Sequence, residues 1–257
     1  DIKPERVIYL GDDFTLQTLI WSDNYQWARR RITINSFGSK PQNFYDILKI
    51  GDLIYLQDSV SGKTLDQLPE AEVAFVASNP STGAILAYQG GFNFSKSNFD
   101  RVNQSFPQAG SSFKPFIYSA AIANGYKASD TINDAPIIFE DQNLESAWRP
   151  ENYTGKFYGP IRLREALVQS VNIVSIKLLR ELGIDKAHTF LENFGFPKSR
   201  LAPDLSLALG SSSFSPAEMI RAYNFLANSG EGKNLYFIEK IIDRDNNIIF
   251  QHPHTQP

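Results

Sequence analysis

The order of apolar and polar positions divides the chain into a β-prone front part and a larger part that mixes strands with helices. Before about residue 68, short runs rich in β-branched and aromatic residues alternate with turns of Gly, Asp, Asn and Ser, which is typical of short strands. The runs cover residues 7–10, 16–21, 31–34 and 52–57. They predict a small β-barrel or sandwich, with Trp21 and Trp27 filling its core.

After residue 68, the first signal is a hairpin. Residues 72–78 and 84–89 are apolar on both faces and flank a turn with the sequence Asn-Pro-Ser-Thr-Gly. Strands of this kind need cover on both faces, so helices from elsewhere in the chain would complete a helix-sheet-helix sandwich. A last hairpin is expected over residues 235–251. The pattern thus predicts two domains of an α/β (α+β) protein: a β-rich domain over residues 1–68 and a mixed domain over residues 69–257.

Five helix starts stand out in the second part. Residues 116–124 carry no charge and predict a buried helix, with Pro115 at its start and Gly125 at its end. A helix is expected to start at Pro160, and another run reaches from Asn172 to Gly183. Asp185 is expected to cap the next helix. The segment Ser215-Pro216-Ala217-Glu218 has the spacing of a capping box with proline at the first helical position.

A hydroxyl and an amine lie three residues apart where the buried helix begins. Residues at this spacing share a helix face, so Ser111 and Lys114 can come within hydrogen-bond reach. Burial would lower the pKa of the lysine and leave a neutral amine able to take the serine proton. The helix N-terminus favours the negative charge of an oxyanion. By itself the spacing is weak evidence, because a capping serine and a surface lysine give the same pattern.

The amino-acid composition argues against several classes of function. The 257 residues are 42% hydrophobic and 21% charged, ordinary values for a globular protein with one large or two smaller domains. A formal net charge of −3 argues against a nucleic-acid surface, and the densest basic cluster, Arg29-Arg30-Arg31, is expected to be a solvated strand end. The absence of cysteine excludes a disulfide framework, a thiol nucleophile and a cysteine-zinc site. His188 has no partner at ligand spacing and is expected at the surface, so neither a metal nor a cofactor is expected.

The surroundings of Ser111 resemble a known family. Residues 108–116, Gln-Ala-Gly-Ser-Ser-Phe-Lys-Pro-Phe, are similar to the active-site serine segment of the class A (bifunctional) penicillin-binding proteins of Gram-negative bacteria. The hairpin that ends in Gly90-Gly91-Phe92 resembles the opening hairpin of the family's transpeptidase domain, and Ser170-Val171-Asn172 resembles its second motif. Residues 207–212 are similar to a region that packs beside the family's active site. Residues 1–68 resemble, more loosely, the OB-like linker or docking subdomain.

The resemblance implies a peptidoglycan D,D-transpeptidase on the periplasmic side of the inner membrane, a target of β-lactams. Ser111 would attack the penultimate D-alanine carbonyl of a stem peptide, with Lys114 as its base. Ser170 would relay a proton, and Asn172 would hydrogen-bond Lys114 and the amide of the substrate. β-Lactams would mimic the stem peptide and trap Ser111. The resemblance also implies an outer-membrane lipoprotein activator as a possible partner of the β-rich subdomain.

One departure from the family affects the expected activity. The third motif, Lys-Ser/Thr-Gly, occurs nowhere in the sequence. In the family the amide after this motif is an oxyanion donor, and the loss of one such donor costs on the order of 3 kcal/mol. The chain is therefore expected to hold the linker subdomain and the first part of the transpeptidase domain, and to acylate poorly alone.

Two other functions stay open. A serine β-lactamase needs a water-activating carboxylate, but the pattern Glu-x-x-x-Asn of class A enzymes is absent, and Ser22-Asp23-Asn24 is expected to be a turn. A non-catalytic module that binds peptidoglycan, or docks a partner through residues 1–68, would be compatible with the missing third motif.

Overall fold

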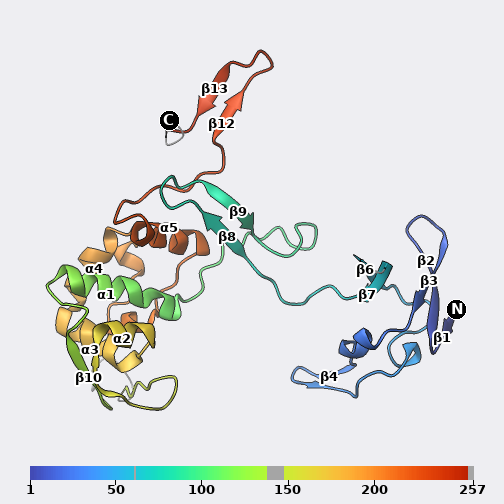
Figure 1. The fold of residues 1–257 in the computed structure, drawn as a ribbon, viewed down its shortest axis with the longest axis horizontal. Helices are drawn as coiled ribbons and strands as arrows, with labels where there is room; N and C mark the ends of the chain where they lie inside the picture. The colour runs from blue at the N-terminus through green and yellow to red at the C-terminus, as the bar shows by residue number, and fades with distance from the viewer. Residues whose placement is uncertain (61, 138–147, 254–257) are drawn as a thin grey trace. The chain divides into compact units, whose positions relative to one another are not determined.

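The computed structural model describes residues 1–60, 62–137 and 148–253, which separate into two compact units, Asp1–Ala71 and Glu72–Pro257 (Figure 1). Each unit has a hydrophobic core of its own. None of the described helices combines the length and the apolar character that crossing a membrane requires.

The first unit is built from short antiparallel strands. Strands β1 (Ile2–Lys3), β2 (Arg6–Leu10) and β3 (Leu16–Ile20) form one sheet in that order. Two further pairs are β4 (Arg31–Thr33) with β5 (Ser36–Phe37), and β6 (Tyr55–Ser59) with β7 (Gly62–Asp66). The 3-10 helices η1 (Asp23–Trp27) and η2 (Phe44–Asp46) connect them. Ser22 caps η1, so Ser22-Asp23-Asn24 is a helix start within this unit.

The core of the first unit is small. Its buried side chains are Val7, Leu19, Tyr25, Phe44 and Leu65. Trp21 packs edge-on against Tyr25 and Phe44, with ring centroids 5.7 and 5.3 Å apart. Trp27 is 46% exposed, so the prediction that both tryptophans fill the core is wrong for Trp27. The short helix η1 turns only Tyr25 inwards, and Trp27 at its end is left facing outwards.

The second unit contains five α-helices and three antiparallel pairs of strands among its described residues. The helices are α1 (Lys114–Ala123), α2 (Leu163–Val168), α3 (Asn172–Leu182), α4 (Ile184–Glu192) and α5 (Pro216–Ala227). The antiparallel pairs are β8 (Phe75–Ser78) with β9 (Ile85–Gln89), β10 (Thr131–Asp134) with β11 (Gly159–Arg162), and β12 (Lys240–Ile242) with β13 (Ile248–Gln251). Three 3-10 helices complete it: η3 (Gly110–Phe113), η4 (Lys198–Arg200) and η5 (Leu205–Leu209). The predicted first and last hairpins are thus confirmed.

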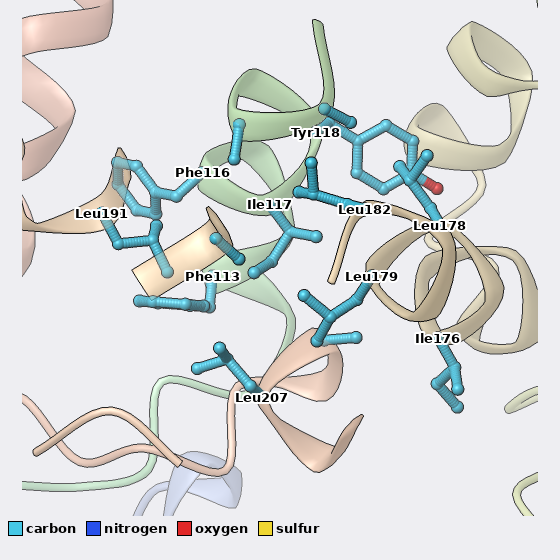
Figure 2. Close-up of a cluster of buried hydrophobic side chains, with 14 of the residues drawn as sticks. Phe113, Phe116, Ile117, Tyr118, Ile176, Leu178, Leu179, Leu182, Leu191 and Leu207 are labelled. Atoms are coloured by element: carbon cyan, nitrogen blue, oxygen red, sulfur yellow. The ribbon is translucent and has the colours of Figure 1, made fainter. Parts of the chain in front are cut away.

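Helix α1 lies at the centre of the large core. It packs against α3, α4 and η5. Figure 2 shows Phe113, Phe116 and Ile117 facing apolar side chains of these elements, among them Leu179, Leu191 and Leu207. Complete burial of a side chain of this size contributes about 1.5–3 kcal/mol. The predicted buried helix is confirmed, with Pro115 in its first turn. Strand β8 lies against α5, while Phe75 and Leu86 of the β8–β9 hairpin stay more than half exposed.

Two predicted helix starts are wrong. Pro160 lies in β11 opposite Asn133, and α2 begins only at Leu163. The fixed φ of proline suits an edge strand as well as a first helical turn, and here pairing with β10 decides between them. Asp185 does not cap α4, because Gly183 ends α3 and is also the N-cap residue of α4, which leaves Asp185 inside the first turn.

His188 was expected at the surface, and this prediction is also wrong. The side chain lies on the buried face of α4 between Ala187 and Leu191 and is only 5% exposed. Its Nε2 atom is 2.9 Å from the carbonyl oxygen of Ala202. The histidine is therefore a hydrogen-bonded core residue, since a buried polar atom needs such a partner.

Candidate active site

Lys114 is the first residue of α1 and is 1% exposed. Its Nζ atom lies 2.6 Å from the carbonyl oxygen of Ser170, 3.0 Å from Ser170 Oγ and 2.7 Å from Asn172 Oδ1. An ammonium has three N–H donors, so each of them meets an acceptor here. Burial lowers the pKa of Lys114 to about 8. About one amine in ten is then neutral at pH 7, which a base for a hydroxyl group requires.

Ser111 lies in η3, the turn that leads directly into α1. The backbone N–H of Lys114 donates to the carbonyl oxygen of Ser111. The serine side chain is exposed, and its hydroxyl makes no hydrogen bond with any residue in the described ranges. The hydroxyl is therefore open to an incoming group one helical turn before the amine, although the two are not hydrogen-bonded to each other here.

The segment that carries Ser111 is held by the residues around η5. Ala109 N donates to Ser212 O at 3.0 Å, and Gly110 N donates to Gly210 O at 2.9 Å. Gly210 has φ 73°, and a Cβ atom there would collide with the carbonyl group of Gly110, so only glycine allows this approach. On the other side, Tyr223 of α5 donates to Ser112 O at 2.5 Å. The backbone next to Ser111 is thus fixed by two other segments.

Ser170 occupies the junction between α2 and α3 in a strained conformation. Its N–H donates to Leu167 O at 3.0 Å, and Val171 N donates to Ala166 O at 2.9 Å, which together form a Schellman motif. The residue that makes the turn has φ 53°, where glycine is usual and another residue costs about 1–2 kcal/mol. This turn brings both oxygen atoms of Ser170 to Lys114.

Asn172 begins α3 and connects Lys114 to a neighbouring loop. Its Oδ1 atom accepts from Lys114, while its Nδ2 atom donates to the carbonyl oxygen of Glu151 at 2.9 Å. The structure therefore brings three of the four predicted site residues into direct contact. The sequence did not predict a role for Glu151 or Asn152. The side-chain Oδ1 atom of Asn152 accepts from Asn172 N at 3.0 Å. The available signal was Val171, an apolar residue that cannot cap the helix that follows it.

The described residues contain no group of three or more His, Cys, Asp and Glu side chains that could hold a metal ion. The arrangement offers a nucleophile, a buried amine and hydrogen-bonding partners for that amine. These are the groups that acyl transfer through a serine requires.

Comparison with known families agrees with this geometry. Residues 73–257 match the family described as the penicillin-binding protein transpeptidase domain. The chain belongs to this family. Residues 6–71 match the penicillin-binding protein OB-like domain. The prediction of a transpeptidase fold preceded by an OB-like subdomain is thereby confirmed.

Individual relatives support the class A assignment. Penicillin-binding protein 1A of Pseudomonas aeruginosa is 41% identical over 251 residues, which cover 97% of this chain and 30% of the relative. Penicillin-binding protein 1A of Escherichia coli is 38% identical over 89% of this chain and 27% of its own length. The crystal structure of penicillin-binding protein 1A from Haemophilus influenzae superposes with a TM-score of 0.81 at 36% identity, over 92% of this chain and 33% of that one.

A more distant relative has been solved together with a β-lactam. PonA1 of Mycobacterium tuberculosis in complex with penicillin V matches with a TM-score of 0.61 at 25% identity, over 71% of this chain and 51% of that one. The present chain spans about a third or less of the length of the 1A relatives. The predicted membership of the class A penicillin-binding proteins of Gram-negative bacteria is confirmed.

Proposed function

We propose that the intact protein is a peptidoglycan D,D-transpeptidase and that Ser111 is its nucleophile. The observation that carries this proposal is the buried Lys114 amine, which lies one turn after an exposed serine and contacts both Ser170 and Asn172. Membership of the transpeptidase family supports it. The β-lactamase pattern Glu-x-x-x-Asn is absent, which favours transfer to an amine over hydrolysis.

The chemistry follows from the roles of four side chains. The neutral amine of Lys114 takes the proton of the Ser111 hydroxyl as its oxygen attacks the penultimate D-alanine carbonyl of a stem peptide. The terminal D-alanine leaves as an amine and takes up a proton, which Ser170 relays from Lys114. The amine of a neighbouring stem peptide then attacks the acyl-serine and releases Ser111. Asn172 accepts from Lys114 and offers its amide edge to the substrate.

The same site would react with β-lactams. The strained amide of such an antibiotic would acylate Ser111, and the acyl group would stay because no amine acceptor reaches it. The complex of PonA1 with penicillin V supports this expectation for the family.

The decisive experiment is covalent labelling of the intact protein with a fluorescent penicillin. Labelling is expected to disappear in Ser111→Ala and to slow at least about 100-fold in Lys114→Ala, because general bases contribute 10²–10⁴-fold. Ser112→Ala is the matched control, since this neighbouring hydroxyl is also exposed but donates only to Ala109 O at 2.7 Å. Wild-type labelling of Ser111→Ala would end the proposal.

We propose further that the site works on the periplasmic side of the inner membrane and that the β-rich unit docks an outer-membrane lipoprotein activator. An open cavity of about 840 Å³ in this unit supports the second point, with Leu53 and Tyr55 exposed along its lining. Leu53→Lys should then weaken capture of the activator by the intact protein and leave penicillin labelling unchanged. Unchanged capture would remove this cavity as the docking site.

A further inference from the structure

Helix α3 starts without a cap of its own. The preceding residue, Val171, has no side-chain hydrogen bond to the helix and no polar atom to make one. The first N–H groups of a helix have no partner inside it and need an acceptor from elsewhere. Here Asn172 N and Ile173 N both donate to Asn152 Oδ1, at 3.0 and 3.2 Å. The acceptor comes from a residue twenty positions earlier in the chain.

The other end of the Asn152 amide is held just as firmly. Its Nδ2 atom donates to Asp134 Oδ1 at 3.0 Å, to Asp134 Oδ2 at 2.9 Å and to Lys156 O at 2.9 Å. Asp134 is completely buried at the end of β10 and also accepts from Tyr158 N at 2.8 Å. Because every acceptor for the amide nitrogen lies on one side, the oxygen of the Asn152 amide must face α3.

The same loop also fixes the side chain of Asn172. The carbonyl oxygen of Glu151 accepts from Asn172 Nδ2 at 2.9 Å, so the oxygen end of that amide is turned towards Lys114, at 2.7 Å from Nζ. Two neighbouring loop residues thus control one site residue. Asn152 holds its backbone, and Glu151 sets which end of its amide meets the lysine.

We propose that Asn152, anchored by Asp134, is a positioning residue for the reaction at Ser111, and that it acts by fixing the first residue of α3 against Lys114. This inference rests on the proposed transpeptidase function. In the described part of the chain no hydrogen bond joins Asn152 to Lys114 or Ser111, so its role is not catalytic. Its 6% exposure also leaves no surface for direct contact with a stem peptide.

A purely structural cap would act differently from a positioning residue. Loss of such a cap would reduce the fraction of folded protein without changing the reaction rate of the molecules that remain folded. A positioning residue changes the rate itself, because a shift of about 1 Å at a reacting group costs on the order of 100-fold. The final amount of labelled protein measures the folded fraction, and the rate constant at saturating penicillin measures the site.

The test is the acylation of the intact protein by a fluorescent penicillin, followed over time at several concentrations and below the melting temperature. Asn152→Ala is expected to lower the saturating rate constant about 10- to 100-fold and to leave the final labelled fraction close to that of the wild type. Asn224→Ala is the matched control. This second buried amide is hydrogen-bonded to Ser78 Oγ, at 3.0 Å from Nδ2, and its loss should leave the rate constant unchanged.

A charge swap tests the anchor. Asn152→Asp sets a second carboxyl group against Asp134 and should be as slow as Asn152→Ala. The double variant Asp134→Asn/Asn152→Asp reverses donor and acceptor between these two residues, since an amide at position 134 can donate to the new carboxylate. It should recover part of the rate, because Lys156 O, which accepted from the Asn152 amide, then faces a carboxylate oxygen. Failure of this recovery would overturn the anchoring role of Asp134.

The inference as a whole is overturned if Asn152→Ala acylates at the wild-type rate, or if its labelling falls only in proportion to the folded fraction. Failure of the proposed function has a different signature. It would appear as wild-type labelling of Ser111→Ala or Lys114→Ala, whatever the behaviour of the Asn152 variants.

Discussion

Helices α3 and α5 begin in opposite ways. At the start of α5, Ser215 Oγ accepts from Glu218 N at 3.2 Å, and Glu218 Oε2 accepts from Ser215 N at 2.9 Å, so the cap lies within four consecutive residues. At the start of α3, the cap is Asn152, which in turn depends on Asp134. A local cap stabilises its own helix. A remote cap also fixes where the helix begins relative to the rest of the unit.

The backbone before the two helices differs in the same sense. Ser215 adopts an ordinary extended conformation before Pro216. Ser170, two residues before α3, is held at φ 53°. Strain of this kind persists only where the surroundings over-determine the conformation, and it is common at functional sites. The strained backbone precedes α3, whose start contacts Lys114. The unstrained backbone precedes α5, whose start contributes only to the stability of the fold.

The largest expected effect is that of Asp134→Ala on stability. The variant would leave the buried Asn152 Nδ2 atom short of acceptors and the partly buried Tyr158 N without its partner, and each loss of this kind costs about 1–3 kcal/mol. We expect the free energy of unfolding to fall by about 3 kcal/mol, measured by urea denaturation. Asp130→Ala, which removes one exposed hydrogen bond to Lys127 N, should cost less than about 1 kcal/mol. If both variants lost the same free energy of unfolding, Asp134 would contribute no more to stability than an exposed residue, and the remote cap would not differ from an ordinary surface hydrogen bond.

The next expected effect is a dependence of the acylation rate on pH. It should come from Lys114, which contacts the start of α3, and not from the start of α5. Since the pKa of Lys114 is lowered to about 8, its neutral fraction rises from about 1% at pH 6 to about 50% at pH 8. Acylation by penicillin should therefore accelerate about 50-fold over this interval and level off above about pH 9. A rate that stays flat from pH 6 to pH 8 would rule out the neutral amine as base.

The start of α5 should not respond over the same interval. Burial raises the pKa of Glu218, but hydrogen bonds from Arg200 and Ser215 outweigh this effect and hold the pKa below its usual value. The carboxylate is then ionised throughout, and the Ser215–Glu218 cap is intact from pH 6 to pH 8. A thermal melt at each pH provides the control, because a change in folding would otherwise imitate a change in rate.

The contrast also explains what the sequence could predict. The Ser215 capping box, Pro115 in the first turn of α1 and the uncharged run after it are local signals, and each was interpreted correctly. The contacts of Lys114 with Ser170 and Asn172 could be proposed because Ser111 and Lys114, and likewise Ser170 and Asn172, occur in short motifs.

Contacts between distant segments left no local signal. The acceptor for α3 lies twenty residues before Asn172, and its anchor Asp134 lies eighteen residues before Asn152. The predictions of burial for His188 and Trp27 were wrong for the same reason. Packing near Ala202 buries His188, and the direction of a short helix leaves Trp27 exposed. A pattern of apolar residues shows which face of an element is suited to a core but not which neighbour will cover it.

A smaller effect is expected when the local cap is removed. Ser215→Ala should lower the free energy of unfolding by about 1 kcal/mol, the usual loss for an N-cap serine. The rate of penicillin acylation should not change, because the Ser215 hydroxyl that the variant removes accepts only from Glu218 N in the first turn of its own helix. Urea denaturation and labelling kinetics on the same sample measure both quantities. A slowed acylation would show that the start of α5 positions the site as the start of α3 does, and the comparison between the two starts would fail.

The smallest effect isolates the strain at Ser170, using two variants that both lack its hydroxyl. Ser170→Gly relieves the cost of φ 53°, whereas Ser170→Ala keeps it, so the glycine variant should be the more stable by about 1 kcal/mol. Both variants keep the backbone carbonyl that accepts from Lys114 and should acylate equally slowly. Urea denaturation measures the difference in stability. If alanine proves as stable as glycine, the turn before α3 stores no strain, and only the remote cap distinguishes the two helix starts.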